Sequence, residues 1–290
     1  MSHLLARIVA AQDVWAKPFG DFNHRWLNAL FGRMVPIRDL LNGTWLGHPL
    51  HPAATDIPIG TLLATVLLDL AGQSAAADIA LVATILFMLA AAVTGMADYA
   101  ETDGIARNRA STHSTLMVIG LVVLVVSLVI RAGNPADRTV VVVLDVIAFL
   151  IVTAGAYVGG DVVYVTGNMV SRHAFRGGGT KWIRLDTGGV ADLAALPEAT
   201  PTKAKAGIND LVLVRIGTTI HAMHATCAHA GGPLNEGTVI DGGVECPWHG
   251  SRFRREDGRA RRGPAVYDQP SYEIRAAAAG GYEVRRAVGN

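Results

Sequence analysis

Four long apolar segments between residues 54 and 160 restrict most strongly what this chain can fold into. They cover approximately residues 54–71, 78–98, 114–131 and 139–160. Each comes close to the roughly 20 residues that a helix needs to cross the hydrocarbon core of a bilayer. A spanning segment must pair its own backbone groups, so we expect four helices. Short turns at 72–77 and 132–138 make neighbours antiparallel, and the sequence predicts an all-α four-helix transmembrane bundle over residues 46–167.

Lysine and arginine residues are distributed unequally between the two ends of this predicted bundle. The end of the bundle that lies away from both termini carries only Arg131 and Arg138. The end with the termini carries Lys17, Arg25, Arg33, Arg38, Arg107, Arg109, Arg172, Arg176, Lys181 and Arg184. Because cytoplasmic loops hold the excess of positive charge, we expect a multi-pass membrane protein with both termini in the cytoplasm. Residues 1–45 hold two amphipathic stretches, which are expected either to lie in the membrane interface or to pack against the bundle.

Several polar residues are expected at the cytoplasmic end of the bundle. His48 and His51 precede the first apolar segment, Asp98 ends the second and His113 begins the third. Imidazole binds iron and accepts protons near neutral pH, so two of these histidines are candidates to bind haem b or to line a quinone pocket. The alternative is that they cap helix ends and hydrogen-bond nearby carboxylates. Asp145, inside the fourth segment, is either functional or paired with a serine or threonine of the bundle.

Short motifs in this half of the chain resemble a family of four-helix bacterial membrane proteins, the DUF2231 family. The matching stretches are GHPLHPAATDIPIG at 47–60, TGMADYAE at 94–101, His113, and GGDVVYVTG at 159–167. The resemblance covers about residues 47–168 and implies a four-helix protein of the bacterial inner membrane. It implies no particular chemistry, because the function of the family is not established.

The C-terminal half has the pattern of a soluble all-β domain over residues 181–288. Runs such as LVLVRIG, TIHAMHA, SYEIRAA and GYEVRRA alternate and are broken by glycine, which is typical of short strands. His221 and His224 lie on one such run and are expected at the strand surface. Residues 168–180 contain three consecutive glycines and are expected to form a hinge after the bundle.

The only two cysteines of the chain both belong to short motifs that also contain a histidine. The motifs are Cys227-x-His229 and Cys246-x-x-His249. Two cysteines cannot build a disulfide framework, and metal binding is the expected role. Two thiolates and two imidazoles suit either a [2Fe–2S] cluster with mixed ligands or a tetrahedral zinc ion. A zinc finger typically begins with two cysteines two to four residues apart, so the spacing favours the cluster.

The two motifs and the strands around them resemble the Rieske family over about residues 181–286. The resemblance implies a [2Fe–2S] cluster in which Cys227 and Cys246 bind the inner iron. His229 and His249 then bind the outer iron, near the surface. It also implies an all-β Rieske-type iron–sulfur domain as the fold of this half.

Four neighbouring residues are compared with high-potential members of that family. Gly232 and Trp248 stand where those members have two cysteines that form a disulfide, and Phe253 stands in place of a tyrosine. Ser251 matches a serine whose hydroxyl donates to a bridging sulfide and raises the potential. We therefore predict a reduction potential between the extremes of the family range, roughly −150 to +300 mV.

Three functions agree with these features. The first is a membrane-tethered carrier of single electrons. The second is a subunit of a quinone-linked or haem-containing oxidoreductase that uses His48, His51 or His113. The third is a non-redox structural or sensing module. A Rieske oxygenase needs a further catalytic domain for its mononuclear iron, and only about 110 residues are available for the soluble domain.

Composition restricts the partners. The net charge of +1 argues against nucleic acid, which requires a clustered basic face. The expected partners are the lipid bilayer and a redox protein that donates or accepts electrons. No nucleophile or phosphate-binding motif assigns a catalytic residue, and an electron-transfer protein or oxidoreductase component is expected rather than a stand-alone enzyme.

Overall fold

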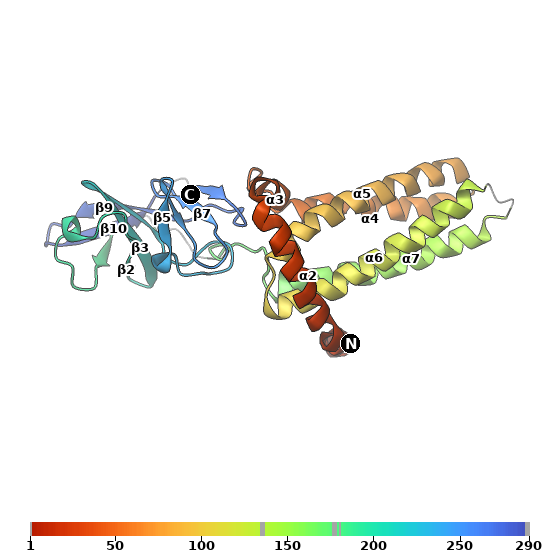
Figure 1. Cartoon of the computed structure of the whole chain (residues 1–290), viewed down its shortest axis with the longest axis horizontal. Coiled ribbons are helices and arrows are strands. Elements are labelled where there is room, and N and C mark those ends of the chain that lie inside the picture. Colours follow the sequence, from red (N-terminus) through yellow and green to blue (C-terminus); the bar gives the residue numbers. More distant parts are fainter. Residues whose placement is uncertain (1, 134–136, 176–178, 180, 288–290) are drawn as a thin grey trace. The chain divides into compact units, whose positions relative to one another are not determined.

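The computed structural model of the protein describes residues 2–133, 137–175, 179 and 181–287. They form two compact units, Met1–Ile37 with Leu50–Asn168, and Arg38–Pro49 with Met169–Asn290. The first unit is helical and the second is mostly β-sheet (Figure 1). The predicted fold class, a helical bundle followed by an all-β domain, is confirmed. Parts of the predicted turn at 132–138, of the predicted hinge with Arg176, and of the domain end at 288 lie outside the described residues.

Four long helices dominate the first unit. They are α4 (Leu50–Leu70), α5 (Ser74–Ala100), α6 (Gly104–Ala132) and α7 (Thr139–Gly160), which continues into the π-helical turn η1 (Asp161–Val165). Among the described residues, these are the four helices long and apolar enough to cross a membrane. Leu81, Leu124 and Ala148 are fully buried between them. Only 22–28% of each span is buried, so apolar side chains cover the outside, as lipid requires.

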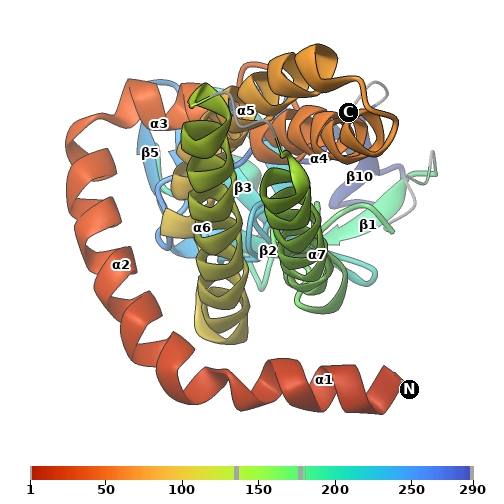
Figure 2. The ribbon, with the colours of Figure 1, turned by 90° about the vertical axis from the view of Figure 1, so that its right-hand side faces the viewer.

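Three further helices precede the bundle: α1 (Ser2–Ala11), α2 (Asp13–Arg33) and α3 (Val35–Asn42). α1 and α2 form a bent arm, and α2 contacts α5 and α6 (Figure 2). Asp21 of α2 pairs with Arg107 of α6 at 2.9 Å, and Asp13 pairs with Arg109 at 3.0 Å. The aromatic residues Trp15, Phe19, Phe22 and Trp26 remain exposed. α2 therefore packs on the bundle and also presents an apolar face that suits a membrane interface.

A network of buried charges joins the four long helices where α4 and α6 end and where α5 and α7 begin. Arg131 of α6 pairs with Asp69 of α4, with Asp78 of α5 at 2.5 Å, and with Asp145 of α7. Arg138 also pairs with Asp78. The side chains of Arg131, Asp69 and Asp145 are at most 2% exposed. The expected serine or threonine partner therefore does not by itself explain Asp145, because Arg131 supplies the countercharge.

The second unit contains two sheets of antiparallel strands. Six strands close a barrel in the order β1-β10-β9-β4-β3-β2: β1 (Ile183–Asp186), β2 (Thr202–Ala206), β3 (Asn209–Ile216), β4 (Thr219–His224), β9 (Ser271–Ala276) and β10 (Tyr282–Arg286). The second sheet has the order β5-β6-β7-β8: β5 (Thr238–Ile240), β6 (Gly243–Glu245), β7 (Arg252–Arg254) and β8 (Ala260–Arg262). Two 3-10 turns complete the unit, η2 (Leu193–Ala195) and η3 (Leu234–Glu236).

β3 is buried on both faces and separates two hydrophobic cores. Successive side chains of a strand point to opposite faces. Leu211 and Leu213 therefore enter the core inside the barrel, whereas Val212 and Val214 enter a core shared with the second sheet. The second core also contains both cysteines. The predicted metal ligands thus stand on a packed apolar base rather than on a mobile loop.

Two segments outside the barrel sequence belong to the same unit. Arg38 donates to the carbonyl of Gly263 at 3.3 Å, and the Thr44 hydroxyl donates to the carbonyl of Ala265 at 3.4 Å. His173, which is 7% exposed, belongs to the second segment, within the predicted hinge. The predicted boundary at 45/46 and the hinge at 168–180 stay predictions, whereas the compact β unit includes 38–49 and begins again at 169.

Candidate metal centre

Two loops with the same backbone hydrogen bonds carry the four predicted ligands. Cys227 follows β4 and Cys246 follows β6. Gly231 donates to the carbonyl of Cys227 at 3.0 Å, and Gly250 donates to that of Cys246 at 3.1 Å. The amide of each cysteine in turn donates to the carbonyl five residues later, at 2.8 Å in both loops. Gly231 and Gly250 have φ angles of +87° and +73°, which only glycine adopts without strain, so both tight turns depend on these residues.

The two loops bring all four predicted ligands together. Cys227 and Cys246 are free and buried, and their thiols are hydrogen-bonded to each other. The rings of His229 and His249 lie with their centres 5.1 Å apart and their planes perpendicular. The cysteines belong to the apolar core, whereas His249 is half-buried. The site therefore has a thiol pair on the inner side and an imidazole pair on the outer side.

This division into two pairs bears on the choice between the [2Fe–2S] cluster and the zinc ion. In the described part of the chain, no three or more His, Cys, Asp or Glu side chains are placed to hold one metal ion. A structural zinc ion takes four such ligands around one point. A two-iron cluster with mixed ligands takes two thiolates on one iron and two imidazoles on the other. The division into a thiol pair and an imidazole pair is the arrangement that such a cluster requires.

Comparison with known proteins agrees with this geometry. Residues 188–273 match the family model described as the Rieske [2Fe-2S] domain. The anthranilate 1,2-dioxygenase ferredoxin subunit of Burkholderia cepacia is 36% identical over 86 residues, which are 29% of this chain and 80% of that protein. The chain belongs to the Rieske [2Fe–2S] family. Residues 47–172 match a second family model, described as a predicted membrane protein (DUF2231), and both resemblances seen in the sequence are confirmed.

Further matches to the Rieske domain include two ferredoxins. Ferredoxin CarAc of Metapseudomonas resinovorans is 30% identical over 70 residues, which cover 24% of this chain and 65% of that protein. Among solved structures, the ferredoxin of carbazole 1,9a-dioxygenase from Nocardioides aromaticivorans is 25% identical. That match covers 37% of this chain and 97% of the ferredoxin, with a TM-score of 0.31.

The electrostatic environment of the Rieske site favours the iron-binding form of His229 and Cys246 but not that of Cys227. Burial, with the neighbouring His249 ring and two arginines, lowers the pKa of His229 to about 3, so the imidazole is neutral. A hydrogen bond from Cys227 lowers the pKa of Cys246 to about 7. The same bond, together with burial, raises the pKa of Cys227. Cluster insertion must therefore displace the proton of Cys227, because metal binding requires thiolates.

Gln269 supports the first Rieske loop, although no sequence motif marks this residue. Its side chain is fully buried, and its amide nitrogen donates to the carbonyls of His224 and Thr226 at 2.6 and 2.7 Å. Its amide oxygen accepts from the Ala228 backbone at 2.9 Å. The amide thus satisfies three backbone groups on either side of Cys227 and fixes the loop.

The expectation that His224 lies at the strand surface is wrong. The residue is 2% exposed, because the end of β4 is covered by the first Rieske loop and by the segment that contains His173. The two rings are 4.6 Å apart, and Nδ1 of His224 accepts from the backbone of Thr226 at 3.1 Å. His173 in turn donates to the Thr226 carbonyl at 2.8 Å. Both histidines therefore support the loop rather than face solvent.

Two residues beside the loops bear on the reduction potential. Ser251 is fully buried, and its hydroxyl oxygen accepts from the backbone of Ala265 at 3.0 Å. Accepting that bond leaves the hydroxyl proton of Ser251 free to donate, as the predicted bond to a sulfide requires. Phe253 is fully buried in the core and offers no hydroxyl group. The site thus retains one of the two hydroxyl donors of high-potential Rieske proteins.

Gly232 and Trp248 stand where high-potential Rieske domains have a disulfide. A β-carbon on Gly232 would lie 2.7 Å from the sulfur of Cys246 and 3.1 Å from the Trp248 ring. The close approach of the two loops therefore requires glycine. Trp248 is 56% exposed, and its ring centre lies 6.4 Å from that of His249. In place of a covalent link, this Rieske domain has an exposed aromatic side chain next to a predicted ligand.

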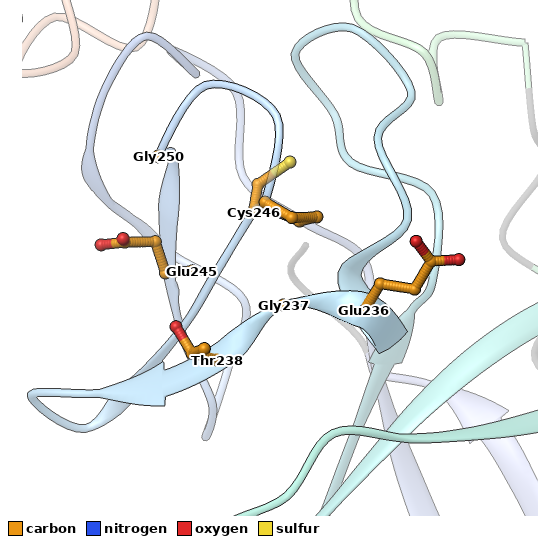
Figure 3. Close-up of a pocket in the computed structure, with 7 residues that line it drawn as sticks. Glu236, Gly237, Thr238, Glu245, Cys246 and Gly250 are labelled. Atoms are coloured by element: carbon orange, nitrogen blue, oxygen red, sulfur yellow. The ribbon is translucent and has the colours of Figure 1, made fainter.

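A small pocket lies beside the second loop (Figure 3). It is lined by Glu236, Gly237, Thr238, Glu245, Cys246, Pro247 and Gly250. The Glu245 carboxylate and the Cys246 thiol point in different directions in this view. Of the four predicted ligands, the lining includes Cys246 alone.

The structure separates the polar residues predicted at one end of the bundle. The rings of His51 and His113 lie with their centres 6.2 Å apart and their planes inclined at 78°. His48 is exposed, and its ring contacts the carbonyl of Pro49. Asp98 is buried, and its Oδ1 has no hydrogen-bond partner among the residues that the structure describes. Of the three histidines considered from the sequence, His51 and His113 form the pair.

Replacing Ser251 with alanine is expected to lower the reduction potential of the cluster. A hydrogen bond to a sulfide stabilises the reduced form more than the oxidised form. A difference of about 1.4–2.8 kcal/mol between the two forms corresponds to roughly 60–120 mV for one electron. Redox titration followed by electron paramagnetic resonance (EPR) measures this shift. Thr219→Ala, at the exposed start of β4, is the control and should leave the potential unchanged. An unchanged potential in Ser251→Ala would contradict the assigned role.

Proposed function

We propose that this protein is a membrane-tethered carrier of single electrons whose [2Fe–2S] cluster is bound by Cys227, His229, Cys246 and His249. The observation that carries the proposal is the separation of the four side chains into a buried thiol pair and an outer imidazole pair. The same chain contains four helices suited to a bilayer. Since a Rieske cluster exchanges one electron at a time, the bundle keeps that exchange at the membrane.

The outer side of the site is where we place electron exchange with a partner. His249 is half-buried, and the exposed ring of Trp248 lies beside it. Large aromatic side chains are common at the centres of protein interfaces. Relatives of the Rieske domain are named as a ferredoxin subunit and a ferredoxin. We infer from them that the partner is a redox protein that docks over Trp248.

The proposed location is the bacterial inner membrane, with the Rieske domain and both termini in the cytoplasm. The end of the bundle that holds Arg107 and Arg109 is also the end from which the chain leaves for the Rieske domain. At the other end, Arg131 is buried in ion pairs, and Arg138 is 22% exposed. The positive-inside rule then places the Rieske domain in the cytoplasm.

A second candidate function is favoured by one specific observation. The pairing of His51 with His113 inside the bundle is compatible with a haem-containing or quinone-linked oxidoreductase subunit. In that case the bundle holds a redox group, whereas in the tethered carrier it serves as an anchor. The two functions therefore differ in the optical spectrum of the membrane domain.

Spectroscopy of the whole protein in detergent tests the proposal. Low-temperature EPR after reduction with ascorbate, and then with dithionite, should show a Rieske-type signal that accounts for about one cluster per chain. We expect a midpoint between the extremes of the family range, and a value clearly above +250 mV would contradict the comparison made at Gly232, Trp248 and Phe253. Folded protein from iron-rich cells without this signal would favour the non-redox module instead.

A further inference from the structure

His51 and His113 are held in the same way by the two helical hairpins of the bundle. Nδ1 of His51, on α4, lies 2.9 Å from the carbonyl oxygen of Ala91 on α5. Nδ1 of His113, on α6, lies 2.8 Å from the carbonyl oxygen of Gly155 on α7. A carbonyl can only accept, so Nδ1 carries the proton in both rings. In each hairpin, a histidine of the first helix thus donates to the backbone of the second helix.

A glycine makes room for each ring. A β-carbon on Gly95 would lie 2.9 Å from the ring of His51, and one on Gly159 would lie 2.9 Å from the ring of His113. Each glycine stands four residues, about one helical turn, after the residue whose carbonyl accepts the bond. Both imidazoles therefore lie flat on a neighbouring helix, and their orientation is fixed by a bond on one side and by a helix surface on the other.

Nε2, the second nitrogen of each ring, is available to bind a metal. With the proton on Nδ1, Nε2 of a neutral imidazole carries a lone pair. In the described part of the chain, neither His51 nor His113 has a hydrogen-bond partner for Nε2. Histidines that bind metals typically donate their other N–H to a backbone carbonyl or a carboxylate, which fixes the tautomer and the ring direction. Both rings have that support.

The separation of the two rings fits two bonds to one metal atom. The ring centres are 6.2 Å apart and the planes are inclined at 78°. A metal–nitrogen bond of about 2.0–2.1 Å plus about 1.1 Å from nitrogen to ring centre gives about 6.3 Å between two opposed imidazoles. His51 and His113 come from different hairpins, so a metal between them lies in the interior of the bundle, where such proteins typically hold cofactors.

We propose that His51 and His113 are the two axial ligands of a b-type haem inside the four-helix bundle. Two imidazoles do not complete the shell of a bare ion, and no third His, Cys, Asp or Glu joins them among the described residues. A porphyrin supplies four equatorial nitrogens of its own, so iron in haem needs only two axial ligands from the protein. A quinone carbonyl needs a donor, whereas both N–H groups are already occupied. The proposal deepens the second candidate function and does not depend on the cluster.

Haem content of the full-length protein is the test. The protein is produced in cells supplied with a haem precursor and purified in detergent, and its haem is measured as the pyridine haemochrome. We expect about one haem per chain and the sharp reduced spectrum of a bis-imidazole haem b. The Rieske EPR signal is recorded on the same sample. Protein with a full Rieske signal and no haem, or with bound quinone instead, would overturn the haem site and leave the tethered carrier intact.

Variants identify the ligands. His51→Gly and His113→Gly should each lose the bis-imidazole spectrum, and added imidazole should restore it by occupying the vacated position. His48→Gly is the matched control, because that ring is exposed and bonds to the neighbouring carbonyl of Pro49. All three variants should keep the Rieske signal. A bis-imidazole spectrum that persists in either of the first two variants would overturn the assignment, and so would its loss in His48→Gly. If a glycine variant does not fold, the haem content of the unchanged protein still decides the proposal.

Discussion

Replacing His229 with alanine is expected to remove the cluster and leave the protein in the membrane. The outer iron loses one of its two imidazoles, and alanine offers no group that binds iron. Iron should fall from about two atoms per chain to near zero, with complete loss of the Rieske EPR signal. The long helices belong to the other compact unit, so the amount of protein in the membrane fraction should not change.

His221→Ala is the matched control for this experiment. His221 is a half-buried histidine of β4 in the same unit, and it belongs to neither loop. It should retain both iron atoms and the signal. If His221→Ala lost the cluster as well, general destabilisation of the domain would explain both results. If His229→Ala kept a normal signal, the proposed ligand set would be wrong.

The parts of the molecule that follow from the sequence are those in which the information is local. Each Rieske loop closes through hydrogen bonds between residues four or five positions apart, so the order of Cys, Gly and His along the chain nearly determines the geometry. The transmembrane helices are equally local, because a long apolar run has no other stable conformation in lipid. Motif and hydropathy were therefore sufficient for the Rieske domain and for the four spans, and the ligand set stays a prediction.

The supporting contacts could not be found in this way, because they join distant positions. Gln269 reaches Ala228 across 41 residues, and nothing in its neighbourhood marks it as a loop brace. His224 was placed at the surface because strand alternation says which face a residue takes but not whether that face is covered. Here His173, 51 positions earlier in the chain, covers it. Burial of this kind is set by tertiary packing.

The histidines of the bundle show the same limit. The sequence placed His48, His51 and His113 at one end, but the choice of a pair depends on how each helix is rotated. Gly95 and Gly159 settle that rotation, since only a helix surface without a side chain accepts the flat imidazole. A glycine at the matching position of both hairpins was visible in the sequence, and its meaning depended on the packing.

The chain passes between the two compact units more than once. The β unit consists of Arg38–Pro49 and Met169–Asn290, so the chain passes between the units three times, near residues 37, 49 and 168. Arg38 and Thr44 hydrogen-bond to the 263–265 segment within the β unit. The inclusion of residues 38–49 in this unit depends on contacts between distant positions, which local sequence patterns do not predict.

Replacing Arg131 with methionine is expected to be among the most destabilising single changes in the bundle. Methionine preserves much of the side-chain volume but removes the countercharge of Asp69 and Asp145, whose side chains are at most 1% exposed. Removing one partner of a buried ion pair typically costs about 3–5 kcal/mol, because the remaining charge has neither water nor a counterion. Unfolding in detergent, followed by helix content, should occur at a markedly lower temperature.

The neighbouring arginine provides the control. Arg138 pairs with the same network but is 22% exposed, and it contacts Asp78, which is 40% exposed. Water can replace part of that interaction, so Arg138→Met should cost clearly less than Arg131→Met. Adding Asp145→Asn to Arg131→Met should recover part of the stability, because one uncompensated buried charge is then removed. Equal losses for the two arginine variants, or no recovery in the double variant, would mean that these residues act by packing and not by charge. The expected outcome, a larger loss for Arg131→Met and recovery in the double variant, would mean that buried charge holds the helices together. Because the network joins all four helices, it would then fix their register at the end of the bundle opposite His51 and His113.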